Sequence, residues 1–243
     1  MAEDVAISDR FKANYRSYYE QGDSEWRWLC ARDKANNIVS LCNALPHSSI
    51  LEIGAGEGSL LKRLSDMDFG ARFSALEISP TGVEAINKRG IPRLVECLFF
   101  DGYALPYGDR KFDLAVLSHV IEHVEYPRRL LYEAARVADH IFIEVPLEDT
   151  LRLRPDFVAD KVGHINFYSA TTIRRLMQTC GLEVLQQAVT NPSKAVHMYR
   201  KGKKGLFNYF VREGFLRILP SLASRVFVYH SSLVCRAGKS SGR

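Results

Sequence analysis

ILEIGAGEGSLL, residues 50–61, is the strongest single indication of fold in this chain. A strand-like apolar run leads into Gly54, Gly56 and Gly58, and an apolar helical pattern begins directly after them. Glycines permit a tight turn and let a ligand approach the backbone closely at the carboxyl end of a first strand. The spacing is one residue shorter than the dinucleotide pattern G-x-G-x-x-G, and no G-K-[ST] ending follows, which disfavours a nucleoside triphosphate.

Apolar runs alternate with helical patterns along the rest of the chain. A first helix is expected from Ser24 to before Pro46. Strands are expected at 49–53, 72–78, 93–99, 112–118, 140–145, 182–190 and 225–235, and helices at 58–66, 81–88, 120–137 and 169–180. Such alternation is typical of a doubly wound, mostly parallel sheet, so we expect an α/β fold.

Composition indicates one folded domain in a reducing compartment. The 243 residues are 47% hydrophobic and 25% charged, and no internal repeat or low-complexity linker divides them. We expect a single domain over 1–243, with an N-terminal helical lid (1–45), a cofactor-binding core (46–190) and a basic helical insertion with the last strand (191–243). No signal peptide or membrane span is recognisable, and the five cysteines are scattered without a C-x-x-C pair. We therefore expect a cytoplasmic protein.

Acidic residues lie at or just after the carboxyl ends of the first three expected strands. Glu52 lies just before the glycine turn, where a carboxylate suits an ammonium-bearing ligand better than a pyrophosphate. Glu77 lies about 20 residues past the turn, where an acidic side chain can accept both ribose hydroxyls. Asp101 follows the third strand, placed to accept a hydrogen bond from an exocyclic amine. Together they predict a site for an adenosine that carries a charged, non-phosphate tail.

With these motifs in order, the sequence resembles the class I S-adenosylmethionine-dependent methyltransferases of the small-molecule group. The likeness covers about residues 45–190 and includes ALEIS, FFDGYALPYGDRKFDLAVLSHVIEHV, RRLLYEAARV and GHINFYSATTIRRLMQTCGLEV. It implies a Rossmann-like, seven-stranded sheet with helices on both faces and an antiparallel last strand. It also implies S-adenosylmethionine as cofactor and S-adenosylhomocysteine as product. The cofactor pocket would be lined by Glu52, Gly54, Ala55, Gly56, Glu77, Ile78, Asp101, Gly102 and Ser118.

SHVIEHV (118–124) contains the spacing H-x-x-E-H, which also occurs in inverted zinc peptidases. A peptidase needs a long helix and a third zinc ligand, and the cofactor motifs leave no room for that fold. After the fourth strand, these residues instead face the acceptor side of the cofactor pocket. They either pack this edge or supply a general base, because a hydroxyl acceptor must lose its proton and histidine titrates near neutral pH. The candidate bases are His119, His123 and His164, the last either a base or a residue that pins its loop.

A metal ion is the third interpretation of the same stretch. Relatives that include ubiquinone-pathway and small-RNA 2′-O-methyltransferases carry E-x-x-E-H here and a later histidine, which together hold Mg²⁺ or a similar ion. In this chain the corresponding set is His119, Glu122, His123 and His164. Three imidazoles and one carboxylate suit a transition metal better than Mg²⁺. We expect no metal in the site and keep these four residues as candidate ligands.

Basic residues are concentrated at the end of the chain. From Lys194 onward there are eleven Lys/Arg and one acid, whereas the preceding residues carry a net charge of −5. Phe207, Phe210, Val211, Phe215, Ile218 and Leu219 form an apolar stripe at helical spacing. The segment 200–219 predicts either a solvated basic face over a packed helix, a helix that closes the acceptor pocket, or peripheral contact with an anionic membrane. Nucleic acid is disfavoured because no RNA-binding module is visible.

These patterns together predict an S-adenosylmethionine-dependent methyltransferase. The expected reaction is direct in-line O-methylation of a small molecule or of a glycan- or lipid-linked intermediate, with a histidine as general base. Two rivals from other classes are a non-catalytic cofactor-binding or RNA-associated subunit and a nicotinamide-dependent oxidoreductase, the latter disfavoured by the shortened glycine spacing.

Overall fold

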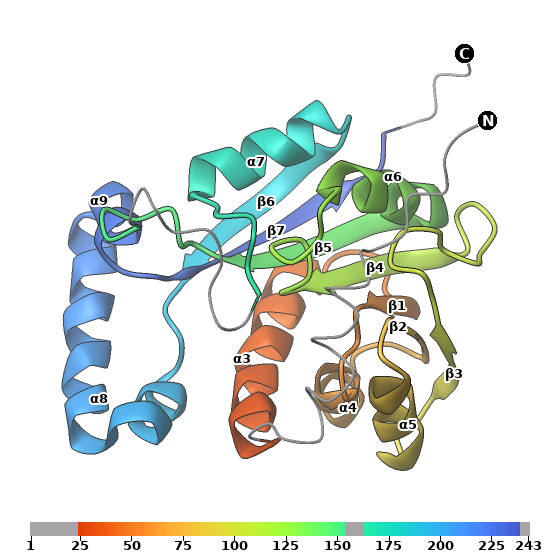
Figure 1. Ribbon diagram of the computed structural model, residues 1–243, viewed down its shortest axis with the longest axis horizontal. Helices are drawn as coiled ribbons and strands as arrows, with labels where there is room; N and C mark the ends of the chain where they lie inside the picture. The colour runs from red at the N-terminus through yellow and green to blue at the C-terminus, as the bar shows by residue number, and fades with distance from the viewer. Residues whose placement is uncertain (1–23, 154–162, 239–243) are drawn as a thin grey trace.

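The computed structural model describes residues 24–153 and 163–238 (Figure 1). Tyr15, Tyr18 and Tyr19, whose spacing is typical of helix packing and which could also belong to the expected lid (1–45), lie outside these residues. One seven-stranded sheet has the strand order β3-β2-β1-β4-β5-β7-β6. Its strands are β1 (Ser49–Ile53), β2 (Arg72–Glu77), β3 (Leu94–Phe99), β4 (Phe112–Ser118), β5 (Ala138–Pro146), β6 (Glu183–Thr190) and β7 (His230–Arg236).

Strand directions confirm the expected fold class. β1 through β5 pair in parallel, and β7 runs antiparallel to both of its neighbours, β5 and β6. The central strand β1 is buried along its whole length, as its continuous apolar run predicts for a parallel strand covered on both faces. The sheet is therefore Rossmann-like and mostly parallel, with an antiparallel last strand.

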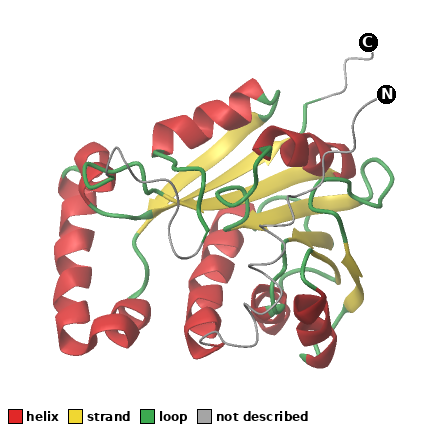
Figure 2. Cartoon of the chain, viewed as in Figure 1, coloured by secondary structure: helices red, strands yellow, loops and turns green. Residues whose placement is uncertain are grey.

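Helices cover both faces of the sheet (Figures 1 and 2). They are α3 (Ser24–Cys42), α4 (Ser59–Asp66), α5 (Pro80–Lys88), α6 (Pro127–Val137), α7 (Ala170–Thr179), α8 (Lys194–Ile218) and α9 (Pro220–Val226). Apolar residues of α6 and α7 form one core on one face of the sheet, and those of α3, α4 and α5 form a second core on the other. Both cores hold the carboxyl ends of the central strands in a fixed arrangement. No helix among the described residues is long and apolar enough to cross a membrane.

Two predicted elements begin later than expected. The helix predicted at 120–137 starts at Pro127, which occupies the first helical position, where its missing N–H is not needed. Residues 119–126 form a turn instead, and His119 in it has a left-handed φ of 58°. The strand predicted at 225–235 starts at His230, because the preceding residues belong to α9 and the short link after it. SHVIEHV is therefore not helical, which removes the peptidase geometry.

Candidate active site

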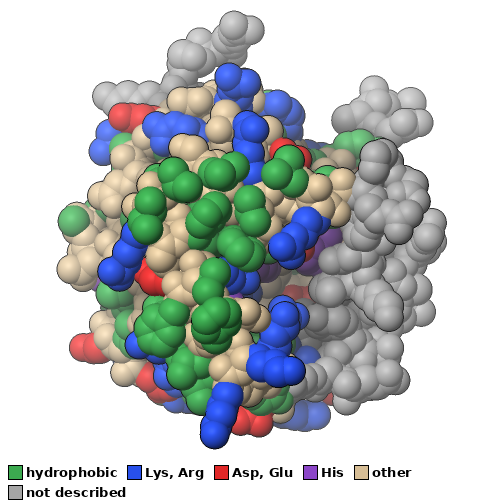
Figure 3. All heavy atoms as spheres, turned by 90° about the vertical axis from the view of Figure 1, so that its left-hand side faces the viewer, with side chains coloured by type: hydrophobic (Ala, Val, Ile, Leu, Met, Phe, Trp, Pro, Cys, Tyr) green, Lys and Arg blue, Asp and Glu red, His purple; other side chains and the backbone are tan. Residues whose placement is uncertain are grey.

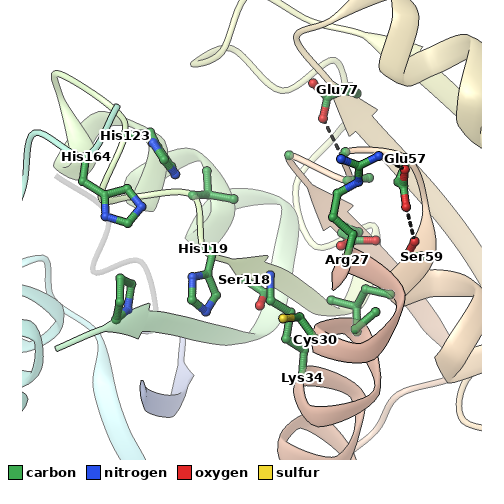
Figure 4. A pocket seen from close by; sticks show the side chains of 18 of the residues that line it. Arg27, Cys30, Lys34, Glu57, Ser59, Glu77, Ser118, His119, His123 and His164 are labelled. Atoms are coloured by element: carbon green, nitrogen blue, oxygen red, sulfur yellow. Dashed lines mark hydrogen bonds and ion pairs between the residues drawn. The ribbon is translucent and has the colours of Figure 1, made fainter. Parts of the chain in front are cut away.

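A cavity of about 440 Å³ opens at the carboxyl ends of the central parallel strands (Figure 4). Its lining includes all but one of the residues predicted from the sequence for the cofactor or the base. They are Glu52, Gly54, Ala55, Gly56, Glu77, Ile78, Gly102, Ser118, His119, His123 and His164. Asp101 does not line the cavity, and its Oδ1 accepts hydrogen bonds from the backbone N–H groups of Tyr103 and Ala104, each at 2.8 Å.

The glycine turn lies directly against the second strand. The backbone N–H groups of Gly54 and Ala55 both donate to the carbonyl of Leu76, at 2.8 and 3.0 Å. Gly54 and Gly56 have φ values of 74° and 62°, in the left-handed region that glycine adopts without a steric penalty. A Cβ atom on Gly54 would lie 2.8 Å from Val120 Cγ2. Close packing as well as backbone conformation therefore requires glycine at this position.

Glu77 fixes the shape of the turn through its carboxylate. Oε2 accepts from the N–H of Gly56 at 2.7 Å, and Oε1 accepts from the N–H of Ser79 at 2.9 Å. Burial raises the pKa of Glu77 to about 7, although these N–H groups oppose the shift. Gly82 on α5 permits this arrangement, since a Cβ there would lie 2.7 Å from Glu77 Cγ. The role of Gly82 was missed from the sequence, where no spacing signals it.

Glu52 has the properties of a group that awaits a cationic ligand. Its side chain is buried at the end of β1 and lines the cavity, and its Oε2 has no hydrogen-bond partner among the described residues. Burial raises the pKa of Glu52 to about 8, and the nearby Glu77 adds to the shift. An ammonium group would satisfy the orphaned oxygen and favour the ionised carboxylate. The buried carboxyl oxygen thus fits the charged tail of an amino-acid-bearing adenosine.

The pH dependence of stability tests this burial. Because the pKa of Glu52 is raised to about 8 in the folded protein, the folded state keeps a proton that the unfolded chain has released. Stability is therefore lost as the pH rises from about 5 to 8. We expect Glu52→Gln, which cannot ionise, to match the wild-type Tm near pH 5 and to exceed it by several degrees near pH 8. Thermal unfolding followed by circular dichroism measures this, and a Tm difference independent of pH would contradict it.

Helix α3, within the segment expected as a lid, supplies a wall of the cavity, although none of its residues was predicted individually. Arg27 NH2 lies 2.7 Å from Glu57 Oε2, and Arg89 NH2 lies 3.0 Å from Glu57 Oε1. Ser59 Oγ donates to the same Oε1 at 2.7 Å. Although burial alone would raise it, the pKa of Glu57 is lowered by these partners. Glu57 therefore connects the glycine turn to α3 (Figure 4). In the sequence, only its position within the turn could have indicated this role.

At the other end of the cavity, two histidines lie against each other (Figure 4). The rings of His123 and His164 have centroids 4.6 Å apart and an interplanar angle of 68°. His164 Nδ1 lies 2.7 Å from Glu148 Oε2, and His123 Nδ1 lies 3.2 Å from the carbonyl oxygen of Gly163. Burial lowers the pKa of His123, which keeps its ring neutral at neutral pH. Glu148 also lines the cavity and was missed from the sequence, because nothing in its local sequence links it to His164.

His119 occupies a different electrostatic environment. Its Nδ1 lies 3.3 Å from Glu122 Oε1 and its Nε2 lies 3.5 Å from Glu144 Oε1, both ion-pair distances to fully buried carboxylates. Burial opposes protonation, yet the two carboxylates raise the pKa of His119 above its ordinary value. His230 packs edge-on to His119 with ring centroids 4.7 Å apart. The two carboxylates therefore favour the protonated form of His119.

The four candidate metal ligands fall into two groups. Glu122, His123 and His164 offer ligand atoms that all lie within 4.8 Å of one another. His119 belongs instead to a group with Glu144 and His230, defined by the same distance. Among the described residues, the predicted set of three imidazoles and one carboxylate is therefore reduced to two imidazoles and one carboxylate.

Solved structures share this architecture. An S-adenosylmethionine-dependent methyltransferase from Aquifex aeolicus has a TM-score of 0.56 at 17% identity and covers 93% of this chain and 98% of its own. One from Leishmania major has a TM-score of 0.65 at 14% identity and covers 93% and 82%. A chain from the complex between the Haloferax volcanii Trm112 methyltransferase activator and the putative methyltransferase has a TM-score of 0.63 at 16% identity and covers 96% and 100%. These similarities define the fold as that of class I S-adenosylmethionine-dependent methyltransferases.

Sequence comparison gives the family. Residues 28–187 match the methyltransferase domain family, and the chain belongs to that family. An uncharacterised protein of Methanocaldococcus jannaschii is 25% identical over 131 residues, which are 54% of this chain and 55% of that protein. The demethylmenaquinone methyltransferase of Renibacterium salmoninarum is 30% identical over 100 residues (41% and 40%). The mitochondrial ubiquinone biosynthesis O-methyltransferase of Candida albicans is 29% identical over 110 residues (43% and 31%). The chain thus spans about a third to just over half the length of these relatives.

Proposed function

We propose that this chain transfers a methyl group from S-adenosylmethionine to an oxygen atom of a small molecule or of a glycan- or lipid-linked intermediate. The observation that carries this proposal is one cavity with two chemically different ends. Glu52, Glu77 and the glycine turn line one end, and the Glu148–His164 pair lines the other. The first end suits an adenosine with a charged tail, and the second suits a hydroxyl that must lose a proton.

The residues present fit the cofactor. Glu52 would hold its ammonium group and Glu77 its ribose hydroxyls, while Ala55, Ile78, Gly102 and Ser118 complete the pocket. Asp101, expected from the sequence to accept from the adenine amine, is left unassigned because it does not line the cavity and its Oδ1 accepts from the N–H groups of Tyr103 and Ala104. Bound there, S-adenosylmethionine supplies an electrophilic methyl group for direct in-line transfer and becomes S-adenosylhomocysteine. The Glu52 oxygen without a partner supports this assignment most directly. The carboxyl of Glu77 retains its backbone bonds to Gly56 and Ser79, which hold it in place for the ribose.

His164 is the best-supported general base. Donation of its Nδ1–H to Glu148 makes Nε2 the basic nitrogen of the ring and fixes its orientation. The acceptor hydroxyl would give its proton to this nitrogen as the methyl group transfers. His123 packs against this ring and is the second candidate base. We rank His119 third as a base, because the two flanking carboxylates favour its protonated form, which has no nitrogen free to accept a proton.

A metal ion is the alternative means of activating the acceptor. Glu122, His123 and His164 lie close enough together to hold one, and Glu122 Oε2 has no hydrogen-bond partner among the described residues, whereas Oε1 lies 3.3 Å from His119 Nδ1. Two imidazoles and one carboxylate would suit a transition metal, which would act as a Lewis acid on the acceptor oxygen. We rank the base first because the short contact between His164 and Glu148 fixes the ring without an ion.

The outer segments complete the proposal. Helix α3, which belongs to the N-terminal lid proposed over 1–45, contributes Trp26, Arg27 and Lys34 to the cavity and would cover the bound cofactor. The basic segment 200–219 would make peripheral contact with a membrane, and 191–243 would form a basic helical insertion and the last strand of the same domain. We propose a cytoplasmic protein that does not bind nucleic acid.

Titration calorimetry with S-adenosylhomocysteine and with NAD tests the cofactor assignment. We expect micromolar binding of the first and none of the second, since the glycine spacing and the partnerless Glu52 oxygen disfavour a pyrophosphate. Binding of NAD alone would replace the proposal with an oxidoreductase. Binding of S-adenosylhomocysteine without incorporation of labelled methyl into any extract would indicate a non-catalytic subunit.

A further inference from the structure

Helices α8 and α9 form a hairpin between β6 and β7, beside the sheet and not on either of its faces (Figure 1). One side of the hairpin is anchored to the domain. Phe215 and Leu216 pack on a small core of Leu147, Ala223 and Tyr229. The position of Phe215 corrects the predicted apolar stripe, because this residue faces inward while the rest of the stripe does not.

The outer side of the hairpin is apolar and exposed. Phe207 and Ile218 are 70% and 77% exposed, far more than expected for large apolar side chains in a packed helix. Phe207 and Ile218 are 11 residues apart, about three helical turns, so they lie on one side of α8. Gly214 lies between them, and a Cβ added there would meet no atom within 4 Å. We call the outer side the apolar face, and it comprises Phe207, Phe210, Val211, Ile218, Leu219 and Leu222. Figure 3 shows apolar side chains gathered on this side of the molecule, with lysine and arginine around them.

A basic corner adjoins the apolar face where α8 bends. Gly202 has φ 55° and ψ −140°, which breaks the helix, and a Cβ on Gly205 would lie 1.9 Å from the carbonyl oxygen of His197. Only glycine at these positions permits the bend. A shallow surface hollow at the corner is lined by Lys201, Lys203, Lys204, Phe207 and Asn208. None of these lysines forms an ion pair with an acidic side chain in the part of the chain that the structure describes.

The charge and shape of this surface suit an anionic bilayer. Lysine ammonium groups attract the phosphates of anionic lipids, and exposed aromatic and aliphatic side chains gain free energy on entering the acyl boundary. Residues from Lys194 onward carry eleven basic residues and one acid, so the whole insertion is complementary to a negative surface. A nucleic acid would leave the apolar face in water, because its phosphates contact only the lysines.

The same hairpin also reaches the cavity. Arg200, just before the bend, and Val228, just after α9, both line the cavity, and the Arg200 guanidinium lies 4.5 Å from the centre of the Trp26 ring on α3. The basic corner therefore begins one residue from the cavity wall. A molecule held in the membrane next to the hairpin would lie beside the cavity that His164 also lines.

We propose that α8 and α9 dock this protein on an anionic phospholipid bilayer. Lys201, Lys203 and Lys204 bind headgroup phosphates while the apolar face enters the acyl boundary. The methyl acceptor is then a membrane-borne molecule with a lipid tail. The docking proposal depends only on the hairpin, whereas the proposal of a lipid-tailed acceptor also depends on the proposed methyl transfer.

Vesicle sedimentation of the full chain, without cofactor, tests docking. We expect binding to phosphatidylcholine vesicles that contain phosphatidylglycerol, weaker binding at high salt and little binding to pure phosphatidylcholine. Replacing Lys201, Lys203 and Lys204 with glutamine should weaken binding roughly 100-fold, at about fivefold per lysine. The matched control replaces Lys62, Lys88 and Lys111, which lie on α4, on α5 and before β4, and should bind as the wild type does. If both triple variants lost vesicle binding equally, binding would depend only on the net charge of the protein, and the proposed site would be wrong.

A second variant tests the apolar face. Phe207→Ser with Ile218→Ser should lose vesicle binding and keep the wild-type Tm and affinity for S-adenosylhomocysteine, because both side chains are mostly exposed. Val95→Ser on β3, also exposed, is the control. If wild-type protein binds no vesicles and light scattering shows a dimer that the serine variant loses, a second copy covers the face and the proposal fails.

The acceptor class has its own readout. Wild-type protein and labelled S-adenosylmethionine are incubated with a membrane extract and an aqueous extract, and methyl incorporation is expected in the organic-soluble fraction of the first. Incorporation only into aqueous products overturns the lipid-tailed acceptor and leaves methyl transfer intact. Vesicle binding without incorporation into either extract contradicts the proposed function and leaves docking intact.

Discussion

His164→Ala is expected to lower kcat at neutral pH by roughly 10²- to 10⁴-fold, the usual contribution of a positioned general base. The affinity for S-adenosylhomocysteine should stay within about twofold, because a base acts on the acceptor proton in the transition state and not on the bound cofactor. Steady-state kinetics together with calorimetry separate the two quantities. His47→Ala is the matched control, since His47 stacks on Phe69 away from the cavity lining. An unchanged kcat in His164→Ala would remove this residue as the base.

Glu148→Gln and chelation distinguish the base from a metal ligand. Glu148 contacts His164 but belongs to neither group of candidate metal ligands. If His164 is a base, Glu148→Gln should lower kcat by about tenfold or more without changing cofactor affinity, because the amide lacks the negative charge that stabilises the imidazolium formed when the ring takes the proton. The wild-type rate should then survive exhaustive chelation. Two results together would instead support the metal. Chelation would abolish the activity of the wild type, and adding a transition metal would restore it. The same metal would restore no activity to Glu122→Gln.

Glu77→Ala is expected to weaken binding of S-adenosylhomocysteine by about 10²-fold or more. The substitution would remove two charge-assisted hydrogen bonds to the ribose, each contributing about 1.5–3 kcal/mol. It would also remove the partner of the Gly56 and Ser79 N–H groups, so the glycine turn would lose its present shape. Titration calorimetry measures the loss directly.

Two further variants sharpen the test of Glu77. Glu77→Gln keeps one acceptor oxygen and should fall between the wild type and alanine. Glu84→Ala removes an exposed carboxylate from the neighbouring helix α5 and should leave the affinity unchanged. If Glu77→Ala binds S-adenosylhomocysteine as tightly as the wild type, the adenosine end of the cavity lies elsewhere.

Sequence alone predicted the fold because each element is encoded locally. Apolar runs and turn residues gave every strand within a few residues except β7, and the glycines at 54–58 marked the first strand-to-helix turn. The carboxyl ends of parallel strands share one edge of the sheet, so Glu52 and Glu77 could be predicted to lie together from strand order alone. Pro127 shows the limit of this reasoning, since an apolar pattern continues through 120–126 although the backbone there forms a turn.

The chemistry of the histidines was decided by contacts between distant parts of the chain. SHVIEHV contains both His119 and His123, and the sequence alone gives no reason to prefer either of them as a ligand or as a base. In the folded protein, Glu144 from β5 lies 3.5 Å from His119 and favours its charged form, while burial favours the neutral form of His123. The partner of His164 is Glu148, 16 residues away across a loop. The sequence by itself determined the sheet and the edge at which its acidic residues meet. Protonation depends on distance and burial, which sequence spacing does not contain. Only the tertiary structure therefore distinguished one histidine from another.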